Sequence, residues 1–256
     1  MLDLCKEIAD AVEEVVGPVL GEPSGGEVVG MGADGTPTKQ IDEVAEERAL
    51  DVARDRGDLR VVTEEAGERE YGDPTHTVVL DPVDGTYNAT HGIPLHAVSV
   101  GVADGDSVDE MRYAHVRELN TGRSYTAERD GGAYFEGDRV EVTDESTPAK
   151  MTVGGVYNIE GFDPTEFDRL RLLGCSSLEL CYVAAGRLDA FVDMRAYLRV
   201  VDFAAAKLVI EEAGGVVTDG YGDELHQVIT PEQRSSVVAA NPKAHESTLG
   251  VLGVSP

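Results

Sequence analysis

The sequence predicts a mixed α/β protein built in layers, and three regions of the chain lead to this prediction. Residues 2–16 and the segment after Thr38 have the apolar spacing of amphipathic helices. Residues 93–142 carry short alternating segments separated by turns such as Asp130-Gly131-Gly132, the pattern of an antiparallel meander. Strands and helices alternate again after about residue 150. Because two α/β regions enclose a β region, we expect stacked layers and not a simple doubly wound sheet.

The N-terminal region is predicted to hold two helices joined by a glycine-rich segment. The first helix presents Leu4 and Ile8 on one face and ends at Gly17-Pro18. The segment from Gly21 to Pro37 lacks periodicity, so it is either a plain connector or a lid or metal-binding flap. Thr38 is expected to cap the second helix.

The remaining predicted elements are apolar runs bounded by turn residues. Expected strands are 59–63, 77–80, 97–102, 111–116, 124–127, 133–135, 139–142, 151–155, 190–192 and 236–240, and expected helices are 164–173, 176–185 and 201–213.

The charge of the chain is strongly negative. It has 21 basic and 49 acidic residues, a formal net charge of −28, and only five of the basic residues are Lys. Such a surface repels nucleic acid and anionic membranes, so we expect neither as a partner. The acidic residues lie within foldable segments and do not form a disordered tail. We favour a halophilic protein in a cytoplasm with molar salt, where charge is screened within about 3 Å, over an acidic protein from a low-salt cell.

Cysteine usage and hydropathy indicate a cytoplasmic protein. Cys5, Cys175 and Cys181 lack metal-ligand spacing and are expected to be free buried thiols in a reducing compartment. Neither a signal peptide nor a twenty-residue apolar span is recognisable in the sequence. The six His residues do not cluster, so we expect core or surface roles for them.

The most informative stretch is Asp81-Pro82-Val83-Asp84-Gly85-Thr86, which directly follows an apolar strand. Two carboxylates at a buried strand end repel each other unless a hard cation such as Mg²⁺ lies between them. Thr86 adds a hydroxyl and a backbone N–H at the same point. The stretch therefore suggests a metal-assisted phosphate site, although Asp, Pro and Gly are also ordinary turn residues.

Further acids support this interpretation. Glu64-Glu65 ends the preceding strand, and ligands in open α/β sheets gather beyond strand ends. Asp202 opens a predicted helix, where it acts either as a capping residue or as another metal ligand.

These three acidic motifs, in this order and spacing, resemble those of the inositol monophosphatase family. The family belongs to the lithium-sensitive, magnesium-dependent phosphomonoesterases that include fructose-1,6-bisphosphatases. The resemblance runs over nearly the whole chain, and residues 32–39 resemble the archaeal branch, whose members often hydrolyse both fructose 1,6-bisphosphate and inositol 1-phosphate. It implies an α-β-α-β-α sandwich in one domain, 1–256, with an N-terminal metal-binding lobe (about 1–145) and a C-terminal α/β lobe (about 146–256).

The resemblance also implies roles for individual residues. Glu64, Asp81 and the carbonyl of Val83 would hold a first Mg²⁺, and Asp81, Asp84 and Asp202 a second, with Mn²⁺ as a substitute. Glu64 and Thr86 would orient the attacking water. Asp42 would accept a hydrogen bond from Thr86, and Asp34 would help to hold a third, loosely bound ion. The expected substrate contacts are Gly85, Thr86, Arg171, Ser176, Ser177 and Arg195.

The chain departs from the family pattern at three places. Val201 replaces a Trp before the third motif, and Met31 stands where a flap Lys is common. Arg195 replaces a glutamate that contacts inositol hydroxyls in animal members. A guanidinium suits phosphate oxygens better than polyol hydroxyls, so we expect a preference for a bisphosphate sugar, unless Arg195 pairs with a surface acid.

The resemblance therefore implies a phosphomonoesterase acting on a small sugar or polyol phosphate. We expect the protein to be a homodimer. Alternatives are a 3′-phosphoadenosine 5′-phosphate phosphatase of the same superfamily, and a catalytically silent, metal-stabilised subunit. An aspartyl-phosphate mechanism is disfavoured, because those phosphatases place their acids two apart, whereas Asp81 and Asp84 are three apart.

The net charge predicts salt-dependent stability. Self-repulsion at −28 should lower the melting temperature in dilute buffer, and molar KCl should raise it by screening. A melting temperature that is the same in both solutions would contradict the halophilic interpretation.

Overall fold

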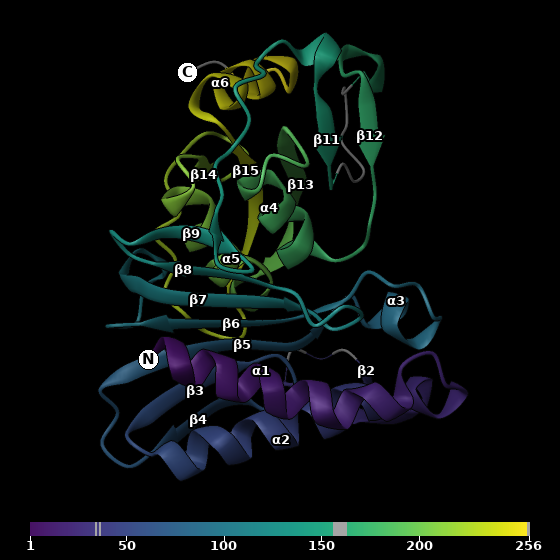
Figure 1. The fold of residues 1–256 in the computed structure, drawn as a ribbon, viewed down its shortest axis with the longest axis vertical. Coiled ribbons are helices and arrows are strands. Elements are labelled where there is room, and N and C mark those ends of the chain that lie inside the picture. Colours follow the sequence, from purple (N-terminus) through teal and green to yellow (C-terminus); the bar gives the residue numbers. More distant parts are fainter. Residues whose placement is uncertain (34, 36, 156–162, 255–256) are drawn as a thin grey trace.

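The fold is a stack of five layers, as the sequence led us to expect (Figure 1). The structure is a computed structural model that describes residues 1–33, 35, 37–155 and 163–254. Helices α1 (Leu2–Val16) and α2 (Gln40–Arg56) form the outer layer below an eight-stranded sheet. Helices α4 (Ser176–Ala184) and α5 (Val200–Glu212) separate this sheet from a five-stranded one, and α6 (Pro242–Val251) covers the far side.

The eight-stranded sheet has the order β10-β9-β8-β7-β6-β5-β3-β4. β3 and β5 are parallel, and the other neighbouring pairs are antiparallel. Its strands are β3 (Leu59–Thr63), β4 (Gly67–Tyr71), β5 (His76–Asp84), β6 (Ala97–Ala103), β7 (Met111–Glu118), β8 (Ser124–Glu128), β9 (Gly132–Phe135) and β10 (Asp138–Arg139).

The five-stranded sheet has the order β12-β11-β13-β15-β14, with β11 parallel to both of its neighbours. Its strands are β11 (Thr152–Gly154), β12 (Arg169–Arg171), β13 (Ala190–Arg199), β14 (Val216–Thr218) and β15 (Arg234–Ala240). A separate pair, β1 (Val28–Met31) with β2 (Pro37–Lys39), and a short helix, α3 (Thr86–Thr90), complete the elements that bear on the site.

Helix α5 lies at the centre of the molecule. Its residues from Val200 to Ile210 are all buried, which an amphipathic helix on a surface would not show. The cluster of buried side chains around it draws members from both sheets, such as Val79 and Phe191. A second cluster fills the space under α1 and α2, and a third lies between the five-stranded sheet and α6.

Two predictions about local structure were wrong. The expected helix at 164–173 is a 3-10 turn, Pro164–Glu166, followed by strand β12. Leu170 packs inward while its two Arg neighbours are exposed, so this short edge strand has period two, which we interpreted as helical. Thr38 does not cap α2. Its hydroxyl donates to Glu65, and Lys39 is the N-cap instead.

Other differences between the predicted and the observed elements concern where they begin and end, or elements that were not predicted. The glycine-rich segment 21–37 contains strand β1, whose four residues are all exposed. The strand expected at 139–142 is only Asp138–Arg139. The sequence analysis missed β4, β14 and α6, and it placed the ends of β5 and β13 too early.

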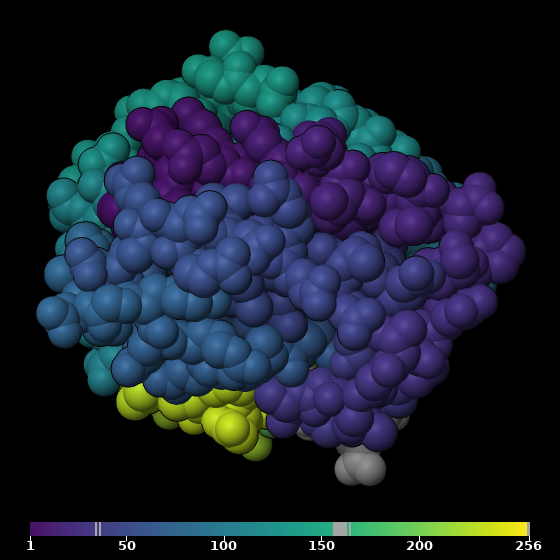
Figure 2. Space-filling view, turned by 90° about the horizontal axis from the view of Figure 1, so that it is seen from below, coloured from purple at the N-terminus to yellow at the C-terminus, as the bar shows by residue number. Residues whose placement is uncertain are grey.

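The face seen from below is formed largely by the first 75 residues, with α1 and α2 lying side by side across it (Figure 2). Within the described ranges, no helix combines the length and the apolar character needed to cross a bilayer.

His115 on β7 is buried beneath α1, and among the described residues neither ring nitrogen has a hydrogen-bond partner. Burial lowers the pKa of His115 to about 3, and the nearby charges of Arg117 and Lys6 act in the same direction, against Asp10. The ring therefore stays neutral in the folded protein at pH values where it is protonated in the unfolded chain.

This buried histidine predicts an acid-sensitive contribution to stability. Because its folded pKa is depressed, the contribution is present above about pH 6.5 and is lost as the pH falls towards 3. We expect His115→Leu to reduce the loss of unfolding free energy between about pH 7.5 and about pH 5 by roughly 2 kcal/mol. Chemical denaturation at both pH values measures the free energy of unfolding of the wild-type protein and of the variant. Replacing the exposed His226 by Leu is the control, and an equal effect of both substitutions would contradict the prediction.

Candidate active site

The site lies where two parallel strands end side by side. In the pairing of β3 with β5, Thr63 is opposite Leu80, so Glu64 and Asp81 follow from adjacent strand positions. Strand β5 continues through Asp84, and the first turn of α5 brings Asp202 to the same place, since Asp202 lines one cavity together with Glu64 and Asp84. The fold thus gathers acids from three separate segments, as the sequence predicted.

A cavity of about 530 Å³ opens at this point. Its lining combines carboxylates with guanidinium groups, and the residues are Glu64, Asp84, Ser176, Arg195, Tyr197, Leu198, Arg199, Asp202 and Arg234.

The carboxylates of Asp81 and Asp84 are buried. Asp81 Oδ1 accepts the backbone N–H of Val83 at 3.1 Å. Asp84 Oδ2 accepts the N–H of Ser177 at 2.7 Å and its hydroxyl at 2.5 Å, and the thiol of Cys175 donates to the same oxygen at 3.2 Å. Burial raises the pKa of both acids, and neighbouring carboxylates raise them further, with Glu64 the larger effect on Asp81 and Asp202 on Asp84.

Glu64 and Asp202 share a cation, the guanidinium of Arg199. Arg199 Nη1 contacts Glu64, while Nη2 and Nε donate to Asp202 Oδ1 at 3.0 and 3.2 Å. Asp202 Oδ2 also accepts the backbone N–H of Arg199 at 2.7 Å, so the capping role that we considered for Asp202 is present. Burial raises the pKa of Glu64 to about 8, although Arg199 acts against this shift.

The donor set suits a hard divalent cation, although the side chains are not arranged around one. Of the four carboxylates in this cluster three are buried and Glu64 is partly buried, and burial together with neighbouring carboxylates raises the pKa of Glu64, Asp81 and Asp84. Oxygen ligands of this kind fit Mg²⁺ or Mn²⁺. Within the described part of the chain, however, no three Asp, Glu, His or Cys side chains are already positioned to hold one ion.

Thr86 makes the hydrogen bond to Asp42 that the family resemblance implied. Its Oγ1 lies 3.0 Å from Asp42 Oδ1 and 3.0 Å from the carbonyl oxygen of Val83. Burial raises the pKa of Asp42 to about 6, against the hydrogen bond from Thr86. Gly85 precedes Thr86 with φ 83°, and a Cβ there would lie 2.9 Å from the carbonyl oxygen of Leu95, so this turn requires glycine.

Only some of the predicted substrate contacts line the cavity. Ser176 lines the cavity, whereas Ser177 uses its hydroxyl on Asp84. Arg195 lines the cavity and pairs through Nε and Nη2 with Asp193, which is fully buried, so its acidic partner is not a surface residue. Arg171 is exposed on β12 and is absent from the cavity lining. The prediction for Asp34 falls outside the described residues.

Sequence reasoning missed three residues that shape the site. Besides Arg199, these are two buried acids that bind main-chain N–H groups. Glu46 accepts those of Glu65 and Ala66 at 3.1 and 3.0 Å, beside Glu64. Glu179 accepts those of Leu173 and Gly174, ahead of Cys175, and burial raises its pKa to about 7. In the sequence, Glu46 and Glu179 are recognisable only as acids on the apolar face of a helix. This pattern does not identify the loop whose N–H groups each acid binds.

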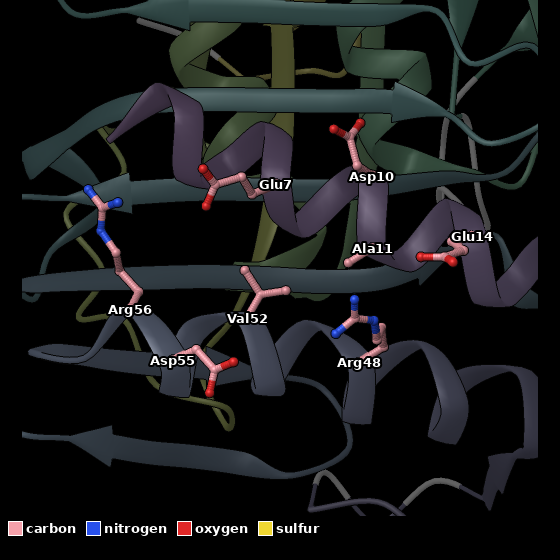
Figure 3. Close-up of a pocket in the computed structure, with 8 residues that line it drawn as sticks. All are labelled: Glu7, Asp10, Ala11, Glu14, Arg48, Val52, Asp55 and Arg56. Atoms are coloured by element: carbon pink, nitrogen blue, oxygen red, sulfur yellow. The ribbon is translucent and has the colours of Figure 1, made fainter.

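A second cavity, of about 590 Å³, lies between α1 and α2 and contains none of the predicted site residues (Figure 3). Figure 3 shows Arg48 extending from α2 towards α1, with Glu7, Asp10 and Glu14 along α1. Three of its acids are spread along α1 and one, Asp55, lies on α2, so they lack the convergence seen at the strand ends and we assign the chemistry to the other cavity.

Comparison with known proteins identifies the family. A fructose-1,6-bisphosphatase/inositol-1-monophosphatase of Methanothermobacter thermautotrophicus is 37% identical over 264 residues, covering 96% of this chain and 94% of that protein. A bifunctional NADP phosphatase/NAD kinase of Methanococcus maripaludis is 34% identical over 99% of this chain, which spans 49% of that longer protein.

Solved structures agree with the sequence comparisons. The structure of an inositol monophosphatase–fructose 1,6-bisphosphatase superimposes with a TM-score of 0.89 at 32% identity, covering 97% of this chain and 98% of the other. A family model, described as the inositol monophosphatase family, matches residues 2–253. The chain therefore belongs to the inositol monophosphatase family, and with it to the phosphatases that hydrolyse phosphomonoesters.

Proposed function

We propose that this protein hydrolyses a small sugar or polyol phosphate, most readily fructose 1,6-bisphosphate and also inositol 1-phosphate, by direct attack of water. The observation that carries the proposal is the convergence of Glu64, Asp81, Asp84 and Asp202 beside a Thr86–Asp42 hydrogen bond. Phosphoryl transfer needs positioning and charge neutralisation more than covalent help, and this arrangement supports both.

Members of this family are typically metal-dependent, and the donor set described above fits that requirement. We assign Glu64, Asp81 and the Val83 carbonyl to one Mg²⁺, and Asp81, Asp84 and Asp202 to another, with Asp34 near a third and Mn²⁺ as a substitute. Bound there, the ions supply positive charge that polarises the phosphate ester and acidifies water.

Thr86 and Glu64 are assigned to orient the attacking water. A Thr86 hydroxyl that donates to Asp42 keeps an oxygen lone pair to accept a hydrogen bond from that water. Water is favoured over an aspartate as nucleophile for a structural reason. Asp81 is 1% exposed and is not part of the cavity lining, and Asp84 Oδ2 is already bound by Ser177 and Cys175.

The cavity residues other than the acids are assigned to the rest of the substrate. Arg195 and Ser176 line the cavity, and the Gly85–Thr86 backbone and Ser177 lie next to the acids, while Arg171 stays a prediction at longer range. The pairing with Asp193 aligns the Arg195 guanidinium beside the cavity, where it would bind a distal phosphate.

The bifunctional relatives favour a second candidate, NADP phosphatase activity. One such relative matches 99% of this chain, and another, from Methanocaldococcus jannaschii, is 28% identical over 98% of it. The 3′-phosphoadenosine 5′-phosphate phosphatase considered from the sequence is a related possibility, since both substrates carry a ribose phosphate. We further propose a cytoplasmic, salt-adapted homodimer, as the charge and the resemblance suggest.

The metal assignment predicts the loss of activity in two variants. Asp84→Asn or Asp202→Asn removes an anionic ligand, so kcat/KM for phosphate release at saturating Mg²⁺ should fall at least about a hundredfold. The exposed Asp55→Asn on α2 is the matched control and should keep full activity. Near-full turnover of either site variant, with a native circular dichroism spectrum, would show that the ligand assignment is wrong.

The assignment of Arg195 predicts a change in specificity. We expect kcat/KM for fructose 1,6-bisphosphate relative to inositol 1-phosphate to fall about ten- to a hundredfold in Arg195→Ala, because a charge-assisted contact is lost. NADP and 3′-phosphoadenosine 5′-phosphate belong in the same assay, because faster hydrolysis of either identifies the second candidate.

Two controls separate this effect from instability. Arg195→Ala leaves Asp193 buried without this partner, so Arg195→Lys and the unfolding midpoints are measured alongside. Exposed Arg54→Ala should leave the ratio unchanged. An unchanged ratio in folded Arg195→Ala would assign Arg195 to structure alone.

A further inference from the structure

Arg199 lies at the centre of the acidic cluster and engages two of its four carboxylates. Its Nη1 contacts Glu64, and its Nη2 and Nε donate to Asp202 Oδ1 at 3.0 and 3.2 Å. The Arg199 side chain is one-fifth exposed, so these ion pairs are largely shielded from solvent. Such charge-assisted bonds are stronger than those between exposed ions.

The main chain fixes Arg199 at this place. It is the last residue of β13 and the N-cap of α5, and its own backbone N–H is bound by Asp202 Oδ2 at 2.7 Å. The backbone bond does not involve the guanidinium. The side chain can therefore change partners while the first turn of α5 keeps its cap.

The same oxygens are needed for two purposes. Glu64 and Asp202 belong to the proposed metal ligands, yet in this structure their oxygens face a guanidinium. In the described residues no group of three potential ligands is positioned for an ion, although Glu64, Asp84 and Asp202 line the same cavity. The ion pairs of Arg199 account for this difference.

The cavity provides space for the displaced side chain. Arg199 lines it together with Arg195 and Arg234, and Arg234 is the residue opposite Arg199 in the pairing of β13 with β15. A guanidinium that leaves Glu64 and Asp202 thus stays beside the cavity in which an anionic substrate would lie.

We propose that Arg199 is an internal counter-cation, which neutralises Glu64 and Asp202 in the metal-free protein and competes with divalent ions for their oxygens. The inference rests on the metal site of the proposed function. Binding of Mg²⁺ exchanges the N–H···O contacts of Arg199 for metal–oxygen contacts. Arg199 therefore keeps the empty acidic cluster folded and at the same time weakens its affinity for metal.

The first test is calorimetric titration of the metal-free protein with Mg²⁺ and with Mn²⁺. Removal of the competitor in Arg199→Met should tighten the Kd about tenfold or more, and the melting temperature of the metal-free protein should fall. Arg195→Met removes an arginine of the same cavity that pairs with Asp193, and in molar KCl its effect on Kd should stay below about twofold. An unchanged or weaker Kd in folded Arg199→Met would overturn the proposal.

The second test uses the wild-type protein, so it does not depend on whether the variant folds. Hydrogen exchange of the Arg199 Nε–H, followed by NMR, should be slow without metal and at least about tenfold faster with saturating Mg²⁺, because the bond to Asp202 is lost. If the Arg199 Nε–H stays protected from exchange at saturating Mg²⁺, the inference is overturned. It is also overturned if neither the wild-type protein nor Arg199→Met binds Mg²⁺ or Mn²⁺. Neither measurement requires turnover, so an inactive protein that binds Mg²⁺ with release of Arg199 would refute the proposed function alone.

Discussion

The burial of negative charge where β3, β5 and α5 meet is the constraint on which the rest of the site depends. Carboxylates at such depth are costly unless they are paired or bound by donors. The chain meets this cost with both local and distant donors: main-chain N–H groups at Val83 and Ser177, the hydroxyl of Ser177 and the guanidinium of Arg199. These donors come from three elements, β5, α4 and β13, so the acidic cluster is stabilised only where these elements meet.

The parallel pairing of β3 with β5 explains why these acids meet at all. In an otherwise antiparallel sheet, this pair ends two strands at the same edge, and Glu64 and Asp81 follow directly. Buried acids beyond the cluster stabilise the surrounding loops. Glu46 binds the turn after Glu64, and Glu179 binds the segment that leads to Cys175. The loops around the cavity are thus held by side chains from the helices behind them.

The sequence alone predicted the layers, the principal helices and the convergence of Glu64, Asp81, Asp84 and Asp202, because strand ends and acidic motifs are local patterns. It did not predict the partner of Arg195, nor the ion pairs of Arg199, because both depend on how β13 bends. The pairing of β13 with β15 is interrupted between Asp193 and Leu198, and Ala196 has a positive φ of 53°. A three-residue edge strand such as β12 is likewise defined by its neighbour and carries little signal of its own.

Helix α5 contacts side chains from both sheets, and its residues from Val200 to Ile210 are all buried. The two sheets therefore depend on the same helix when the protein unfolds. A fragment containing only the eight-stranded sheet would expose the apolar surface that α5 now covers, and so would a fragment containing only the five-stranded sheet. We therefore expect the two halves to unfold cooperatively, without a stable intermediate in which one half persists. Because Asp202 lies in the first turn of this helix, the acidic cluster shares the global stability of the fold and does not open as a local loop.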